Sequence, residues 1–155
     1  QPGMLYEQTI RWHYKGRKIR STPDARGHSH LVDLKTTRDA SLEKFKWDVL
    51  RSAYHAQLAI YARAMESENG FHPRDVYIVA VESKPPYPCS VHRLTPRTLE
   101  QGWRLCSGWL DQILECENAG KWPGYAPDVV DLDAPFDVDA DLEWDEGSTD
   151  KEEQD

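Results

Sequence analysis

The chain has 155 residues, of which 39% are hydrophobic and 30% charged, a balance typical of a globular protein rather than a fibrous or wholly disordered one. No apolar run approaches the roughly 18 residues of a membrane span, and three dispersed cysteines form neither a disulfide set nor a metal-binding motif. These features argue against a membrane protein and a disulfide scaffold, and they favour the reducing cytoplasm.

The net charge of −8 is distributed unevenly along the chain. Residues 126–155 carry thirteen acidic residues and one lysine, whereas residues 1–125 carry fourteen acidic residues and eighteen Lys or Arg. We therefore expect a mildly basic domain at 1–125 that suits a polyanion, followed by an acidic tail that is largely disordered. The tail could serve solubility, dock a partner protein or cover a basic channel as a DNA mimic, and the sequence does not separate these roles.

The first part of the chain predicts three strands, because it is rich in aromatic and β-branched residues and is interrupted by two turn-forming segments. The first turn is Lys15-Gly16-Arg17, so the second strand is expected to pair back on the first. The second turn contains Pro23 and Gly27. The three strands are expected at residues 6–14, 18–22 and 29–36.

Two helices, two strands and a long final helix are predicted to follow. Ser41 and Thr95 are candidate N-caps, and Asn69-Gly70 is a typical helix end. These elements are expected from Ser41 to about residue 50, at about 53–68, at 75–82, at 87–94 and from Thr95 to about residue 120. Their order predicts an α/β (α+β) fold with a mixed central sheet flanked by helices.

The third predicted strand carries the first candidate for chemistry. Asp33 and Lys35 share one face of that strand, and Asp24 lies on the turn before it. Two carboxylates and nearby main-chain carbonyls suit Mg²⁺, which activates water and offsets charge on phosphate, while a lysine stabilises developing negative charge. The triplet alone is not specific, because Asp and Lys on an exposed strand usually form a solvated ion pair.

The second predicted helix carries another candidate group, since Tyr54, Gln57 and Tyr61 share one face at helical spacing. If this face covers the strand of Asp33, Gln57 could bind water or a phosphate oxygen, and Tyr61 could pack or donate a hydrogen bond. Gln57 could equally mark the polar edge of the helix. The sequence does not show which strand this face covers.

Together these residues resemble the PD-(D/E)xK nucleases, with Asp24…Asp33-Leu34-Lys35 as the signature and Gln57-Leu-Ala-Ile-Tyr61 as the Q-x-x-x-Y motif of the RecB-type branch. More narrowly, about residues 5–125 resemble the exodeoxyribonuclease VIII (RecE)-like nuclease domain of phages and prophages. The segments that carry this resemblance are YEQTIRWHYKGRKIRSTPDA, LVDLKTTRDAS, YHAQLAIYARA, VYIVAVESKPPYPCSVHRL and KWPGY. It implies a restriction-endonuclease-like core.

The resemblance also implies roles for particular residues. Asp24, Asp33 and the Leu34 carbonyl would bind Mg²⁺ or Mn²⁺. Glu7 matches a glutamate that lies near the active site in the related lambda-exonuclease group. The implied catalytic set is Glu7, Asp24, Asp33, Lys35, Gln57 and Tyr61.

The activity implied by the resemblance is exonucleolytic hydrolysis of linear double-stranded DNA from 5′ to 3′, for recombination or phage DNA processing. The implied setting is the cytoplasm of a bacterium or phage-infected host, with a single-strand annealing recombinase as partner and a homo-oligomer as a further expectation. Two alternatives stay open. One is an endonuclease or repair nuclease on the same fold, and the other is a truncated, non-catalytic module that binds DNA or a partner.

One feature departs from the family pattern. RecE-like and RecB-like domains carry a metal-ligating histidine on a helix upstream of the first strand, and only six residues precede Glu7 here. His13, His28 and His30 are not at the matching position. We therefore expect either a fragment or a shortened member of the family.

A basic hairpin is the candidate DNA-binding surface, because cations interleaved with Trp12 and Tyr14 suit phosphate and base contacts. The same charges on a solvated hairpin would only discourage edge-to-edge pairing. With one arginine that follows the third strand, the candidate DNA contacts are Arg11, Lys15, Arg17, Lys18, Arg20 and Arg38.

Overall fold

The computed structural model describes residues 3–126 and 128–132, and the chain divides into two compact units, Gln1–Lys121 and Trp122–Asp155. In the second unit, the described residues form neither helix nor strand. Most of the predicted acidic tail lies outside the described residues, so its predicted disorder stays a prediction. In the part of the chain that is described, no helix is long and apolar enough to cross a membrane.

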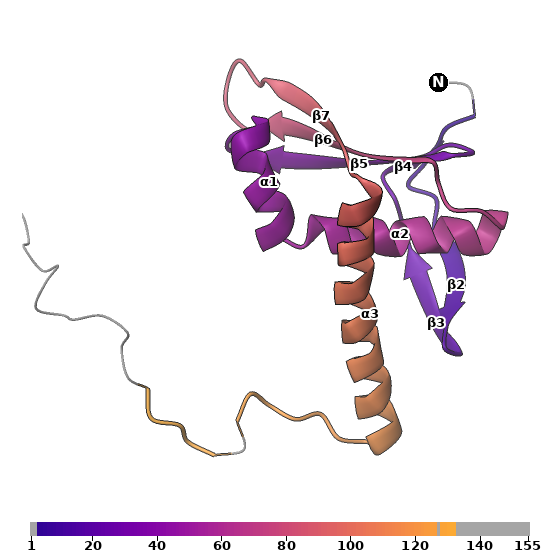
Figure 1. Ribbon diagram of the computed structural model, residues 1–155, viewed down its shortest axis with the longest axis vertical. Helices are drawn as coiled ribbons and strands as arrows, with labels where there is room; N and C mark the ends of the chain where they lie inside the picture. Colours follow the sequence, from indigo (N-terminus) through magenta and orange to yellow (C-terminus); the bar gives the residue numbers. More distant parts are fainter. Residues whose placement is uncertain (1–2, 127, 133–155) are drawn as a thin grey trace, which may run out of the picture. The chain divides into compact units, whose positions relative to one another are not determined.

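The first unit is built on a five-stranded mixed sheet with the order β1-β4-β5-β6-β7 (Figure 1). Strands β5 and β6 are parallel and the other neighbours are antiparallel. A parallel pair needs a crossover, and α1 and α2 supply it on one face of the sheet. This arrangement confirms the predicted fold class. The strands are β1 Leu5–Tyr6, β4 Ala25–Arg26, β5 His30–Thr37, β6 Asp75–Glu82 and β7 Cys89–Arg93.

The predicted strand at 6–14 is wrong in one respect, because the chain breaks it into two. Glu7 adopts a positive φ of 50°, which an extended strand cannot accommodate, and the chain leaves the main sheet there. The second piece, β2 (Ile10–Tyr14), pairs with β3 (Arg17–Ser21) as a separate two-stranded sheet, which is the predicted hairpin. The short strand β4 was not predicted, since residues 23–27 resemble a turn in sequence.

The three helices agree with the predicted periodicity: α1 spans Leu42–Arg51, α2 spans Tyr54–Asn69 and α3 spans Pro96–Ala119. The join that the sequence left undefined lies at Ala53, whose left-handed backbone (φ 53°) separates α1 from α2. Gly70 ends α2 in the same conformation, with φ 80°.

The two predicted N-caps differ. Thr95 caps α3 as expected, since its Oγ1 accepts the Thr98 N–H at 3.2 Å. Ser41 precedes α1 but makes no side-chain capping bond. Instead, Asp39 Oδ1 accepts the Ser41 N–H at 2.8 Å, so a side chain two residues upstream of Ser41 stabilises the turn before the helix.

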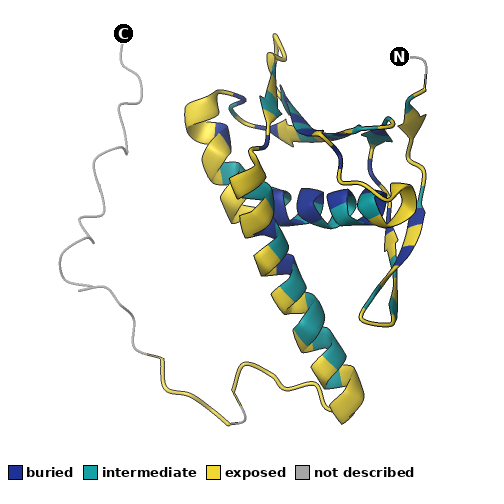
Figure 2. Ribbon diagram, turned by 45° about the vertical axis from the view of Figure 1, so that its right-hand side comes forward, coloured by how far each residue is buried: buried dark blue, intermediate teal, exposed yellow. Residues whose placement is uncertain are grey.

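Helix α2 is the centre of the core, and buried residues run along most of its length (Figure 2). It packs against the sheet, the β2–β3 hairpin and α3. Small side chains make this crowding feasible, and Gly102 of α3 approaches the His55 main chain so closely that a Cβ there would lie 2.2 Å from the carbonyl oxygen. The buried residues of α2 are His55, Ala56, Leu58, Ala59, Ala62, Ala64 and Met65.

Candidate active site

The middle of β5 turns Asp33 and Lys35 toward the helix-covered side of the sheet. Asp33 is only 1% exposed and the Lys35 side chain 16%, whereas Leu34, which points the other way, is 55% exposed. The predicted alternation is therefore confirmed. The alternative of a solvated ion pair on an open strand face does not hold, because the carboxylate is buried.

Asp33 is a buried carboxylate whose charge is only partly compensated. Its Oδ2 lies 2.5 Å from Lys35 Nζ, and no other described residue donates to that oxygen. Burial raises the pKa of Asp33, the Lys35 ammonium opposes that rise, and the charge of Asp24 adds to it. The site therefore favours a further positive charge near this carboxylate.

Helix α2 places its predicted polar face against this strand. Lys35 Nζ donates to Gln57 Oε1 at 2.9 Å, and Gln57 Nε2 donates to Tyr61 Oη at 2.9 Å. The ammonium also lies 4.8 Å from the centroid of the Tyr54 ring, a cation–π distance. We predicted no role for Tyr54 from the sequence, although its spacing from Gln57 placed it on the same face of the helix. Two residues of α2 thus contact the lysine directly, and Tyr61 acts on it through Gln57.

Asp24 reaches the site from the segment that precedes β4. Its Oδ2 accepts the main-chain N–H of Leu34 at 2.7 Å, which ties the carboxylate to the strand between Asp33 and Lys35. Glu7 is joined to Asp24 through the main chain, since the Glu7 N–H donates to the Asp24 carbonyl at 3.0 Å. The Glu7 side chain is exposed. The structure thus brings Asp24, Asp33, Lys35, Gln57 and Tyr61 together, whereas Glu7 is joined to them only through its main-chain bond to Asp24.

The donor set fits a hard divalent cation that retains water. Within the described residues, no group of three or more His, Cys, Asp or Glu side chains is arranged to hold a metal. The protein offers the carboxylates of Asp24 and Asp33 and the nearby Leu34 carbonyl, and Mg²⁺ is typically bound by one or two carboxylates plus waters. The Asp33 carboxylate is buried and forms its described ion pair with Lys35, and a divalent cation bound beside it would further offset the charge that burial disfavours.

The basic hairpin divides into paired and unpaired cations. Lys15 Nζ lies 2.7 Å from Asp111 Oδ1 on α3, and Arg17 pairs with Glu117 nearer the C-terminal end of the same helix. The Lys15 ammonium lowers the pKa of the Asp111 carboxyl. These two cations join the hairpin to α3. Among the described residues, no ion pair engages the remaining predicted DNA contacts, which are Arg11, Lys18, Arg20 and Arg38.

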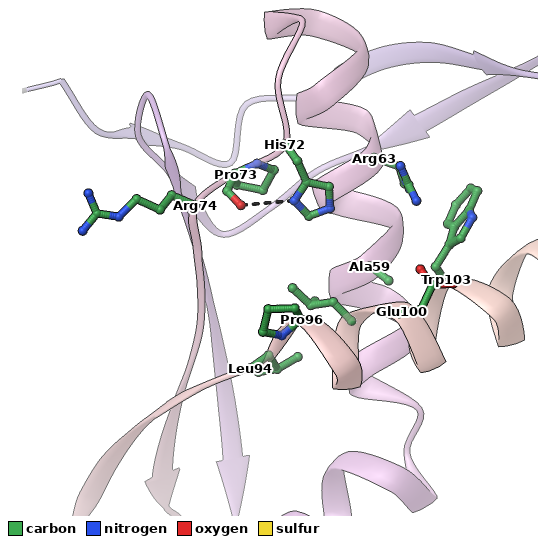
Figure 3. Close-up of a pocket in the computed structure, with 10 residues that line it drawn as sticks. Ala59, Arg63, His72, Pro73, Arg74, Leu94, Pro96, Glu100 and Trp103 are labelled. Carbon is green, nitrogen blue, oxygen red and sulfur yellow. Dashed lines mark hydrogen bonds between the residues drawn. The ribbon is translucent and has the colours of Figure 1, made fainter.

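A hollow of about 300 Å³ lies away from these residues, between α2, the start of α3 and the segment before β6 (Figure 3). Ala59 and Arg63 line it from the side of α2 opposite Gln57 and Tyr61, because two residues turn an α-helix by about 200°. The Arg63 guanidinium lies 5.0 Å from the Trp103 ring centroid there. None of the predicted catalytic residues lines this hollow.

Comparisons with known proteins agree with this geometry. A crystal structure of a protein from Eubacterium rectale, described as a "Putative exonuclease", superposes with a TM-score of 0.66 at 16% sequence identity. The match covers 86% of this chain and 55% of the other, so the chain spans little more than half of that protein's length, and the likeness is one of fold. The comparison with curated proteins gives no match. Residues 7–131 match the PDDEXK-like domain of unknown function DUF3799, and the chain belongs to this family, which confirms the predicted relation to PD-(D/E)xK nucleases.

Proposed function

We propose that this chain is a divalent-metal-dependent deoxyribonuclease that hydrolyses phosphodiester bonds, with Asp24, Asp33 and Lys35 as its active-site residues. The observation that carries the proposal is the buried, incompletely paired Asp33 carboxylate beside a lysine held by the polar face of α2. Membership of a PDDEXK-like family supports a nuclease-like domain with DNA as its substrate.

Each residue has a role that follows from its contacts. Asp24, Asp33 and the Leu34 carbonyl would hold Mg²⁺ or Mn²⁺, which when bound lowers the pKa of water and offsets phosphate charge. Lys35 is held in place by Gln57 and by the Tyr54 ring, so its ammonium can donate to a phosphate oxygen without reorganising.

Two further residues act around this set. Tyr61 holds the Gln57 amide in the orientation that presents Oε1 to Lys35. Glu7, joined to Asp24 through the main chain, is the proposed further carboxylate at the edge of the site. The proposed DNA contacts are Arg11, Lys15, Arg17, Lys18 and Arg20 of the hairpin and Arg38 after β5, of which only Lys15 and Arg17 form ion pairs with described residues.

The finer form of the proposal is an exonuclease on linear double-stranded DNA, acting from 5′ to 3′ in recombination or phage DNA processing. Its support is the sequence resemblance to RecE-like domains and the description of the Eubacterium rectale protein. A single-strand annealing recombinase as partner, a homo-oligomer and a cytoplasmic location belong to the same proposal.

A digestion assay tests both levels. End-labelled linear duplex and closed circular DNA are incubated with the full chain in Mg²⁺, Mn²⁺ or EDTA. We expect metal-dependent loss of the linear substrate alone. Cutting of the circle would instead show an endonuclease, and no cutting by a folded protein would favour the non-catalytic module.

Matched variants assign the site in the same assay. Lys35→Ala should slow hydrolysis by roughly 10²–10³-fold, the usual cost of removing one transition-state donor. Lys84→Ala removes the same charge from an exposed loop and should leave the rate unchanged. Equal rates for the two variants would contradict the assignment of Lys35.

A further inference from the structure

An open cleft of about 800 Å³ runs from the candidate active site along α1. Tyr54 lines the cleft and its ring also contacts the Lys35 ammonium, so the cleft adjoins the candidate active site at this residue. The end of β5 and one side of α1 form the other walls. A strand of substrate that leaves the site in this direction would therefore enter the cleft. We call it the Trp47 cleft, after the aromatic residue on its rim.

Trp47 projects from α1 with 61% of its surface exposed. Phe45 of the same helix is buried in the core, and two residues turn an α-helix by about 200°, so Trp47 lies on the outer side of α1. Lys46 Nζ lies 5.7 Å from the Trp47 ring centroid, which places a cation beside the aromatic face. A single exposed tryptophan is unremarkable, but one on the wall of a charged cleft beside an active site has the form of a base-stacking platform.

The charges of the cleft favour an anion. Its two carboxylates are already engaged: Asp39 accepts the Ser41 N–H, and Asp48 accepts the Thr37 hydroxyl at 2.9 Å and pairs with Arg51. Arg38 and Lys44 also line the cleft, and neither forms an ion pair with a described residue. The lining therefore carries three cations, Arg38, Lys44 and Arg51, against the two carboxylates, a net positive charge that attracts phosphates.

We propose that the Trp47 cleft binds an unpaired stretch of DNA, with one base stacked on Trp47 and the adjoining phosphates at Arg38 and Lys44. A base inside a duplex has both faces covered by its neighbours, and only the terminal pair of a blunt end exposes one face, so the platform favours unpaired nucleotides over intact duplex. This inference rests on the proposed nuclease function and extends it, because it assigns the substrate end to a frayed strand rather than a paired one.

The test is a binding measurement that requires no hydrolysis. Fluorescence anisotropy of a fluorescein-labelled oligothymidylate and of a blunt hairpin duplex is recorded with the full chain in EDTA. We expect Trp47→Ala to weaken binding of the single strand about tenfold, the effect of losing one stacked base, and to change duplex binding less than twofold.

Two control variants keep the result interpretable. Trp47→Phe retains an aromatic face and should recover most of the affinity. Trp109→Ala removes a tryptophan that is 45% exposed on α3, outside the cleft, and should bind like the parent protein. Equal weakening for both DNA forms, or none for Trp47→Ala in a protein that melts like the parent, would overturn the proposal.

The two proposals can fail separately. If the chain cuts linear DNA but Trp47→Ala binds the single strand normally, the platform is wrong and the nuclease stands. If the chain does not cut DNA but single-strand binding depends on Trp47, the cleft stands as a binding site and the catalytic proposal falls.

Discussion

Helix α3 packs closely on α2 at Gly102, and a single methyl group there tests the arrangement that supports the active site. A Cβ at residue 102 would lie 2.2 Å from the His55 carbonyl oxygen, 2.5 Å from its carbon and 2.9 Å from the Ala56 nitrogen. All three are main-chain atoms in the first turn of α2, so no side-chain rotation relieves the contact. Gly102→Ala must therefore push α3 away from α2.

The change in the free energy of unfolding caused by Gly102→Ala is the balance of two opposing effects. Real Cβ atoms essentially never approach closer than 3.0 Å, so the helices must separate by at least 0.8 Å at this point. Overpacking of this kind costs about 1–3 kcal/mol, and a rigid main-chain contact belongs at the upper end. Replacing Gly by Ala inside a helix returns about 1 kcal/mol. We expect a net loss of about 2 kcal/mol in the free energy of unfolding.

Gly108 on the same helix provides the matched control. A Cβ there meets no atom within 4 Å, so Gly108→Ala should gain about 1 kcal/mol from helix propensity alone. Urea unfolding at constant pH measures both variants, with midpoints compared at an unchanged slope. A stabilised Gly102→Ala protein would refute the close packing of α2 on α3. Because His55 lies two residues before Gln57, we also expect the Gly102 variant to lose DNA cleavage.

Two further predictions concern the candidate site. Burial raises the pKa of the Asp33 carboxyl in the folded protein. Below the unfolded-state pKa of about 3.9 the carboxyl is protonated in both states and costs no stability. As the pH rises through the folded-state pKa, the carboxylate becomes charged in its buried position and the fold is destabilised. Asp33→Asn should therefore raise Tm at neutral pH in EDTA and lose that gain as the pH falls toward 3.9; a lower Tm at neutral pH would mean that the Lys35 ion pair outweighs burial. Tyr61→Phe removes the hydroxyl that accepts a hydrogen bond from the Gln57 amide, and it should lower the free energy of unfolding in urea by about 1 kcal/mol. The Tyr77 hydroxyl bonds to no described residue, so Tyr77→Phe should lower it less. Equal losses would show that the bond from Gln57 to Tyr61 contributes nothing.

Much of the local structure could be predicted from the sequence, because it depends on neighbours along the chain. The three helices follow the apolar period, Thr95 caps α3, and β6 coincides with the apolar run at 75–82. Alternation placed Asp33 and Lys35 on one face of β5, and helical spacing did the same for Gln57 and Tyr61. These inferences need only the geometry of one element at a time.

What only the tertiary structure decided is which faces meet. Lys35 bonds to Gln57 across 22 residues, and Lys15 pairs with Asp111 across 96, and no local pattern encodes either contact. Periodicity shows which side chains share a face, but packing decides which face is covered. The burial of Asp33, and with it the raised pKa of its carboxyl, depends on the elements that pack around β5, of which α2 is one.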